Sequence, residues 1–198
     1  MNDMITIDTG IGIVTAPERV EPLPLFNDKH PMLHTKMPEY EIAMLPNSLM
    51  MNIINRLKLT MQIYNGVGLS ANQCGIKERV FVLGGNDFQM VCINPKVVKT
   101  NGAIIQMREG CLSYPGLYMN IPRYDSIDVE FHNENGELQQ MNLVGITAHC
   151  FQHELDHMDG ITFTQKVGAA KLQIARERQQ KLIKKIQRDA KNAPRQTV

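Results

Sequence analysis

The chain has 198 residues, 43% of them apolar and 21% charged, a composition typical of one soluble globular domain. Its longest apolar segments fall well short of the roughly 20 residues that cross a bilayer, which argues against a membrane-spanning protein. The net charge of +1 conceals an asymmetry, because residues 166–198 carry ten basic residues against Glu177 and Asp189, or +8, whereas the preceding residues carry −7. A basic tail on an acidic body suggests a polyanionic partner for the tail.

Residues 1–45 contain five prolines, at positions 17, 22, 24, 31 and 38, and show no sustained periodicity. Proline removes a backbone donor and disfavours helix at the preceding residue, so we expect an extended arm over the body. The N-terminus has neither a basic segment leading into an apolar stretch nor an Arg-rich transit pattern, so cytoplasm is expected. An organelle matrix or the cytoplasm of a virus-infected host would also fit.

The rest of the chain contains helical and strand patterns that are segregated along the sequence. Apolar residues at helical spacing predict helices over about 47–64, 144–158 and 167–190. Runs rich in β-formers near residues 80, 90, 126 and 139 predict strands, and Asn135-Gly136 predicts a hairpin between the last two. Because strands and helices are segregated, we expect an α+β fold with short antiparallel strands around a central metal-binding helix. We expect a catalytic domain over 1–165 and a basic C-terminal helix and tail over 166–198.

Four cysteines are too few for a disulfide framework in a domain of this size. Cys74, Cys92 and Cys150 are expected to be small buried apolar residues, as free cysteines usually are. Cys111 is a candidate for chemistry.

The predicted second helix contains His153-Glu154-Leu155-Asp156-His157, which places two imidazoles on one helical face beside a carboxylate. The bland alternative is a chance match on a solvated helix. A catalytic metal site usually has three protein ligands, so a third must come from another histidine, a cysteine or a carboxylate. His149 is excluded because it lies about 11 Å along the helix from His157, and it is expected to line the pocket instead. The remaining histidines are expected to be surface or satisfied residues: His30, His34 and His132.

Three segments, Gly66–Gln73, Glu109–Ser113 and Gln152–His157, resemble in order and spacing the signature motifs of peptide deformylases. The resemblance spans about half of the chain. One departure is Ser70-Ala71, where the family usually has two alanines. A hydroxyl buried there needs a hydrogen-bond partner.

The resemblance implies removal of the formyl group from the N-terminal formyl-methionine of new polypeptides. It implies that Cys111, His153 and His157 bind Fe(II), for which Zn(II), Ni(II) or Co(II) can substitute, although these ligand types alone suit zinc equally well. Glu154 would be the general base. The Gln73 amide and the Leu112 backbone N–H would stabilise the negative charge on the carbonyl oxygen.

The expected substrate site surrounds these groups. Helix geometry places Cys150, His149 and Ile146 on the face of His153, and the resemblance adds further members of the binding site, namely Gly66, Val67, Gly68, Glu109 and Gly110. It also suggests a buried ion pair between Glu109 and Arg123 that supports the cysteine loop.

Two other functions remain as alternatives. A zinc endopeptidase shares the helix motif but usually takes a downstream histidine or glutamate as third ligand, and no histidine follows His157. A non-catalytic ribosome- or nucleic-acid-binding module would not need Glu154 and Gln73, which are both intact. The basic C-terminal helix is either a solvated helix or, as the resemblance suggests, a segment that docks on ribosomal RNA.

Overall fold

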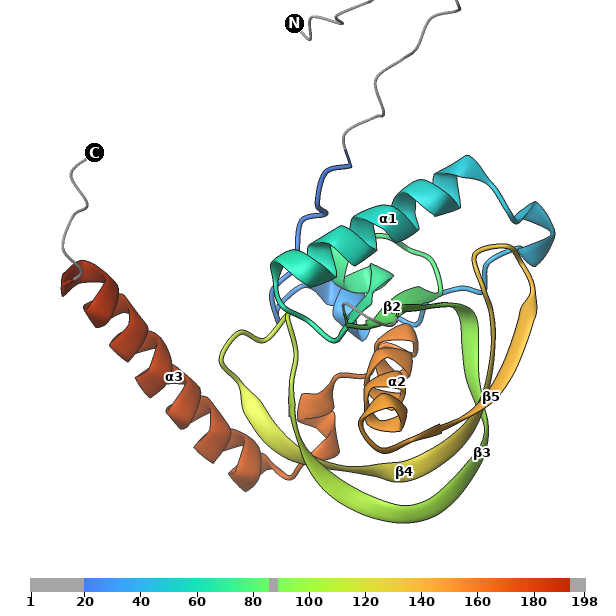
Figure 1. Cartoon of the computed structure of the whole chain (residues 1–198). Coiled ribbons are helices and arrows are strands. Elements are labelled where there is room, and N and C mark those ends of the chain that lie inside the picture. Colours follow the sequence, from blue (N-terminus) through green and yellow to red (C-terminus); the bar gives the residue numbers. More distant parts are fainter. Residues whose placement is uncertain (1–19, 86–88, 193–198) are drawn as a thin grey trace, which may run out of the picture.

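The computed structural model describes residues 20–85 and 89–192. This part of the chain forms a five-stranded antiparallel sheet in the order β1-β2-β3-β4-β5, with α-helices on both sides of its strongly curved strands (Figure 1). The strands are β1 (Gly68–Ser70), β2 (Val80–Gly84), β3 (Gln89–Gly110), β4 (Tyr118–His132) and β5 (Leu138–Val144). The helices are α1 (Ser48–Ile63), α2 (Gly145–Met158) and α3 (Ala169–Asn192), with the 3-10 turns η1 (Pro31–His34), η2 (Ile42–Met44), η3 (Ala71–Cys74) and η4 (Phe163–Lys166). The α+β class is confirmed.

The three predicted helices are present within one or two residues of their expected ends. Helix α1 begins after Asn47, whose side-chain oxygen accepts a hydrogen bond from Met50 N at 2.9 Å and caps the helix. It ends before Asn65, which has a left-handed φ of 52°, as a helix that stops at a tight turn requires. Its apolar face is buried against β1 and β2.

Strands β3 and β4 are longer than the expected short strands. β3 has 22 residues and β4 has 15, and the two pair as far as Gly110 and Tyr118. Most of β3 beyond Val97 is exposed or half-buried, so its side chains lack the apolar alternation that identifies a strand in a sequence. The extra length matters because β3 ends at Gly110, so that Cys111 follows it directly at the middle of the molecule. The predicted β4–β5 hairpin is confirmed, and Gly136 adopts a φ of 83° in its turn.

Helix α2 lies at the centre, enclosed by the curve of β3, β4 and β5 (Figure 1). Phe151 on α2 is fully buried and packs edge-on against Phe81 of β2, with ring centroids 5.1 Å apart. Phe131 of β4 packs against the same ring. Because α2 is held by the sheet along its length, the side chains on its other face have fixed positions.

The N-terminal arm is extended over residues 20–45 apart from two short turns, as expected; the first 19 residues lie outside the described part. Leu23, Leu33 and Met37 bury their side chains in three different apolar clusters. Met37 N donates to Met158 O at 2.8 Å, at the end of α2. The arm therefore covers the body rather than hanging from it.

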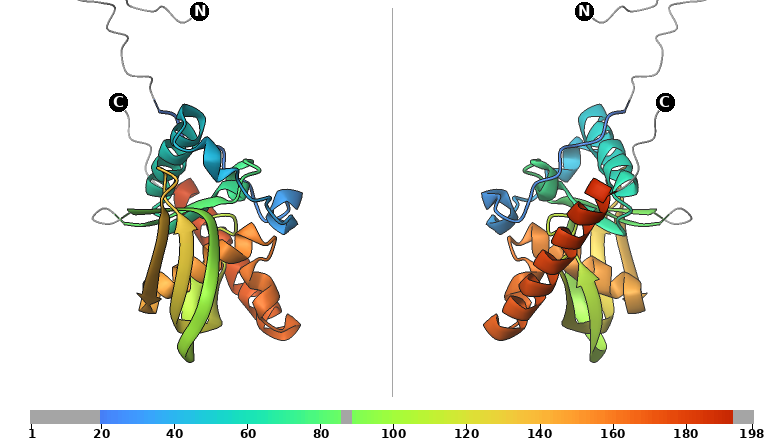
Figure 2. Two further views of the ribbon diagram at one scale, coloured as in Figure 1. Left: turned by 90° about the vertical axis from the view of Figure 1, so that its right-hand side faces the viewer. Right: turned by 90° about the vertical axis from the view of Figure 1, so that its left-hand side faces the viewer.

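Helix α3 is docked over its first half only. Ala175 is 8% exposed and packs with Leu172 in a cluster that includes Tyr114 and Phe163. Gln179 Nε2 donates to Pro115 O at 2.7 Å. Leu182 is 40% exposed and still lies beside Gly116, whereas Ile186 is 58% exposed, so the C-terminal part of the helix extends away from the body (Figure 1, Figure 2). Within the described residues, no helix has the length and apolar character of a membrane span.

Candidate metal centre

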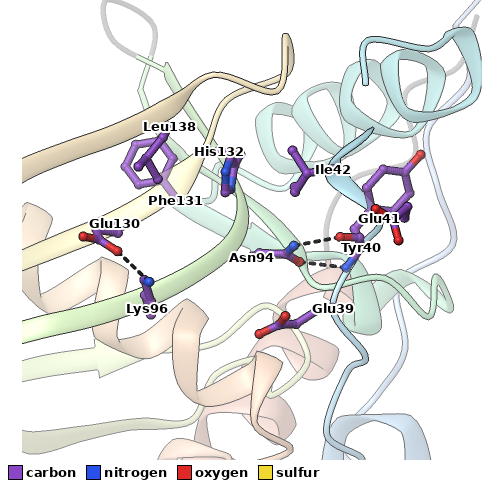
Figure 3. A pocket seen from close by; sticks show the side chains of 10 residues that line it. All are labelled: Glu39, Tyr40, Glu41, Ile42, Asn94, Lys96, Glu130, Phe131, His132 and Leu138. Atoms are coloured by element: carbon purple, nitrogen blue, oxygen red, sulfur yellow. Dashed lines mark hydrogen bonds and ion pairs between the residues drawn. The ribbon is translucent and has the colours of Figure 1, made fainter. Parts of the chain in front are cut away.

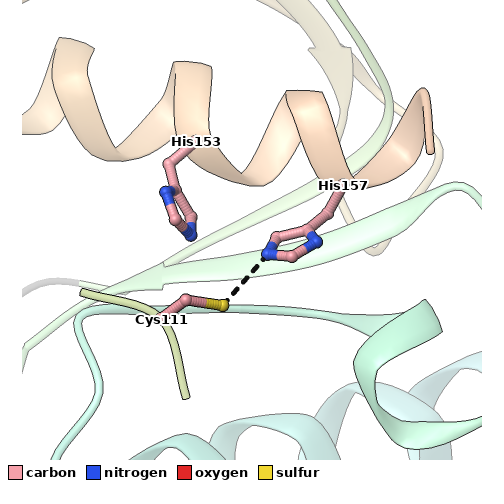
Figure 4. Close-up of side chains that lie close together, drawn as sticks. All are labelled: Cys111, His153 and His157. Carbon is pink, nitrogen blue, oxygen red and sulfur yellow. Dashed lines mark hydrogen bonds between the residues drawn. The ribbon is translucent and has the colours of Figure 1, made fainter. Parts of the chain in front are cut away.

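Three side chains from two distant segments converge on one point (Figure 4). His153 and His157 lie one turn apart on α2, and Cys111 lies in the loop directly after β3. The potential ligand atoms of the three residues all lie within 4.8 Å of one another, and Cys111 Sγ is 3.3 Å from His157 Nε2. A thiolate and two imidazoles at these separations fit a single divalent ion, whose bonds to sulfur and nitrogen are about 2.0 to 2.3 Å long. His149 is outside this cluster, as the helical pitch requires.

The electrostatic surroundings of the two imidazoles also suit a cation. Burial disfavours a charge on His153, but hydrogen bonds to Cys111 and Glu109 raise its pKa to about 10. The environment therefore stabilises positive charge at this position. Burial instead lowers the pKa of His157 well below its usual value, which keeps this imidazole in the neutral form that binds metals.

A buried charge network holds His153 in place. Glu109 Oε2 is 2.7 Å from His153 Nδ1, which leaves Nε2 as the nitrogen that faces the cluster. Arg123 donates from Nε to Glu109 Oε1 at 2.5 Å and from Nη1 to Asp156 Oδ2 at 2.7 Å. Burial opposes the charge on Glu109, but the hydrogen bonds from His149, His153 and Arg123 hold its pKa well below the usual range. The ion pair of Glu109 and Arg123 thus joins β3, β4 and α2.

The Glu154 carboxylate is enclosed beside the cluster. It is 4% exposed, and burial raises its pKa above the usual value, as suits a proton acceptor. A Cβ atom at Gly68 would collide with Glu154 Oε1, so only glycine leaves room for the carboxylate there. Ser70 Oγ donates a hydrogen bond to Glu154 Oε2 at 2.6 Å, which gives the expected partner for the unusual hydroxyl.

The Gln73 amide is fixed next to Cys111 and is only 2% exposed, so it is not an ordinary surface amide. Its Oε1 accepts from Ser70 N at 2.9 Å, and its Nε2 lies 3.3 Å from Cys111 Sγ. Nε2 also donates to Ser113 Oγ at 3.1 Å, a contact that sequence reasoning missed. Leu112 follows Cys111 directly, and a Cβ at Gly66 would lie 2.8 Å from its Cδ1.

Sequence reasoning also missed Asn72. Its Nδ2 donates to His157 O at 2.7 Å and to Met32 O at 3.3 Å, so it links the arm to the end of α2. Its position between Ala71 and Gln73, inside the first motif, is the sequence feature that could have indicated a structural role for Asn72.

The expected substrate-binding residues differ in their exposure to solvent. Val67 and Ile146 are 60% and 59% exposed, and Cys150 is half-buried with its pKa raised by burial to about 12. Gly66, Gly68 and Leu112 are half-buried, and Gly110 is exposed. His149 is turned away from solvent: it is 2% exposed, and its Nε2 lies 2.5 Å from Glu109 Oε1. The structure thus places His149 in the charge network.

Cys74 and Cys92 are buried and unpaired, as predicted.

A separate cavity of about 440 Å³ lies between the arm and strands β3 to β5 (Figure 3). Its lining includes His132, and Asn94 Nδ2 donates to Tyr40 O at 2.8 Å at its edge. None of the three clustered side chains lines it. His34 is exposed, and His30 accepts a hydrogen bond from Met32 N and stacks on Phe26.

Comparison with known proteins gives a consistent result. The family model described as polypeptide deformylase matches residues 22–173. A peptide deformylase of Stenotrophomonas maltophilia is 33% identical over 83% of this chain and 98% of its own length. One of Prochlorococcus marinus is 40% identical over 55% of this chain, but only 56% of that relative is spanned. The crystal structure of a peptide deformylase from Synechococcus elongatus in complex with actinonin superposes with a TM-score of 0.75 at 31% identity, covering 82% of this chain and 88% of that one.

Proposed function

Because the chain belongs to the polypeptide deformylase family, we propose that it is a metal-dependent hydrolase that removes the formyl group from the N-terminal formyl-methionine of newly made polypeptides. The observation that carries this proposal is the convergence of Cys111, His153 and His157 next to the buried carboxylate of Glu154. All four residues lie inside the segment matched by the family.

We assign Cys111, His153 and His157 as the metal ligands and Fe(II) as the native ion, with Zn(II), Ni(II) or Co(II) able to replace it. When bound, the ion supplies Lewis-acid chemistry, which lowers the pKa of water toward neutrality and polarises a carbonyl group. The charge network around Glu109 and Arg123 supports this assignment, because a metal-binding imidazole needs a partner on its other nitrogen.

Glu154 is the general base. Its carboxylate accepts a proton from the attacking water, whose oxygen forms a bond to the formyl carbon. Glu154 then returns the proton to the leaving nitrogen as the C–N bond breaks, which yields formate and a free N-terminal amine. The raised pKa of Glu154, caused by burial, suits a group that must both take and give a proton.

Gln73 and Leu112 stabilise the developing charge. The Gln73 side-chain N–H and the Leu112 backbone N–H are donors for the carbonyl oxygen as it becomes negative. The Gln73 amide is oriented because its Oε1 accepts from Ser70 N, while its Nε2 contacts Cys111 Sγ and Ser113 Oγ, one of which it exchanges for the carbonyl oxygen.

The substrate lies along the glycine segment before Ser70. We assign eight residues to its binding site and the walls of the methionine pocket: Gly66, Val67, Gly68, Glu109, Gly110, Ile146, His149 and Cys150. Exposed Val67 and Ile146 offer apolar contact, whereas buried His149 acts from behind through Glu109.

The decisive test is formate release from a formyl-methionyl tripeptide by protein whose metal content is measured by elemental analysis. We expect release to depend on bound metal and to be inhibited by actinonin, which the Synechococcus relative binds. Cleavage of internal peptide bonds without formate release would favour the endopeptidase alternative. Metal-loaded protein with neither activity would favour a non-catalytic binding module.

The outer half of α3 is our candidate for ribosome binding by a cytoplasmic enzyme, with residues 1–165 as the catalytic domain and 166–198 as the basic helix and tail. The exposed segment carries five basic side chains, Lys181, Lys184, Lys185, Arg188 and Lys191. Phosphate contacts release counterions, so binding to ribosomal RNA should weaken as salt rises.

The tail is tested by truncation after Gln180, because an earlier cut would remove packed Ala175 and Gln179. We expect normal turnover of a short formyl-peptide and reduced co-sedimentation with ribosomes at low salt. Equal sedimentation of both forms at two salt concentrations would leave the outer half as a solvated helix.

A further inference from the structure

Ser70 contacts both catalytic side chains of the proposed reaction. Its Oγ donates to Glu154 Oε2 at 2.6 Å and approaches Glu154 O at 3.2 Å, while its backbone N–H donates to Gln73 Oε1 at 2.9 Å. Ser70 is fully buried and Glu154 nearly so, which means that solvent does not compete for this contact. The hydroxyl is also where this chain departs from the two alanines usual in the family motif.

The two oxygens of Glu154 are not equivalent. Oε2 accepts the hydrogen bond from Ser70, whereas Oε1 lies over Gly68, where no Cβ leaves the space open. Among the described residues, no protein group donates to Oε1. The hydrogen bond from the Ser70 hydroxyl favours the orientation that keeps Oε2 against Ser70 and Oε1 over Gly68.

We propose that Ser70 is a positioning residue for Glu154: its hydroxyl holds Oε2, so that Oε1 is the oxygen that receives the proton of the attacking water. This inference rests on the proposed role of Glu154 as general base. The proton moves from water to Oε1 while the water oxygen bonds to the formyl carbon. It then passes from Oε1 to the departing nitrogen, and Ser70 keeps its own proton throughout.

Removing the side chain keeps the Ser70 backbone N–H that donates to the Gln73 side chain, although the hydroxyl also caps the Gln73 backbone N–H at the start of η3. Ser70→Ala deletes the hydroxyl, and Ser70→Cys keeps nearly the same volume with a much weaker donor. Thr60→Val is a matched control: Thr60 is a fully buried hydroxyl in α1 that donates to Arg56 O at 2.7 Å, outside the site.

We expect Ser70→Ala and Ser70→Cys to lower kcat for a formyl-methionyl tripeptide by about three- to tenfold, because small errors in the placement of a base are costly. KM should stay within about twofold, because the substrate contacts remain. Metal content should equal that of the wild type. Thr60→Val should leave kcat and KM unchanged even if it lowers thermal stability.

A double-mutant cycle shows whether Ser70 acts through Glu154. In a Glu154→Gln background, Ser70→Ala should cause no further loss of kcat, because the group that it positions is already absent. Full kcat in Ser70→Ala or Ser70→Cys, or an equal loss in Thr60→Val, would overturn the proposal. So would additive losses in the cycle. Normal turnover by Glu154→Gln itself would instead refute the base assignment.

Discussion

Glu154 lies on α2 between His153 and His157, but it is not one of the three clustered ligands: its carboxylate accepts a hydrogen bond from Ser70 and lies over Gly68. Two tasks are therefore divided between adjacent residues of one helix. His153 faces the metal site, whereas Glu154 handles the proton. Substitution at Glu154 should separate them.

The variant Glu154→Gln keeps the size and a hydrogen-bonding oxygen for Ser70 but cannot accept a proton. We expect bound metal at the wild-type level and a kcat lower by about 10² to 10⁴, the usual contribution of a general base. Elemental analysis and formate release on the same sample provide the measurement. Near-normal turnover by metal-loaded Glu154→Gln would require a different base.

Arg123 connects elements rather than single residues. It is 5% exposed and binds Glu109 at the end of β3 and Asp156 on α2, while lying itself on β4. Removing one partner of a buried ion pair leaves the other charge uncompensated. Removal of Arg123 would therefore leave the buried carboxylates of Glu109 and Asp156 without a counter-charge and destabilise the folded state.

For Arg123→Met we expect a loss of about 3 to 5 kcal/mol in the free energy of unfolding, measured by urea denaturation with metal present. Lys96→Met is the matched control, because Lys96 pairs with Glu130 at 2.6 Å on the same two strands but is 63% exposed at its side chain. It should change stability far less. Similar losses of unfolding free energy in both variants would mean that the buried network stabilises the fold no more than an exposed ion pair does.

The elements differ in how far the sequence predicts them. Helices α1 and α2 follow from local patterns: an apolar stripe, an Asn cap, and imidazoles one turn apart. The outer part of β3 does not, because its residues are held by pairing with β4 rather than by an apolar face. The contact of Ser70 with Glu154 joins residues 84 positions apart, and the partner of His149 likewise depends on how β3 meets α2. Such contacts arise only in the folded chain.

At the scale of the whole molecule, the candidate metal centre joins the loop after β3 to central helix α2. An ion held by Cys111, His153 and His157 would bind the folded state and not the unfolded chain, so its removal should destabilise the entire domain. At a free ion concentration about 100 times Kd, the stabilisation is about 2.7 kcal/mol.

A chelator should therefore lower Tm by about 5 to 11 °C for a chain of this size. In Cys111→Ser, which replaces the thiolate by a poorer ligand, metal should be lost on dialysis and the chelator should have little further effect. Glu154→Gln is the control that should keep the full shift. An unchanged metal content in Cys111→Ser would remove Cys111 from the ligand set.

The rigidity of helix α3 bears on how the enzyme would be oriented on a partner that binds this helix. Its 24 residues are about 36 Å long, and the part beyond Gln180 accounts for roughly 18 Å. Ala175 and Gln179 fix the inner half to the body, so the outer half is a stiff rod set at a fixed angle. A surface that binds the outer half of α3 therefore also fixes the orientation of the candidate metal centre relative to that surface. A flexible linker of equal length would limit only the distance between the enzyme and that surface and would leave its orientation free.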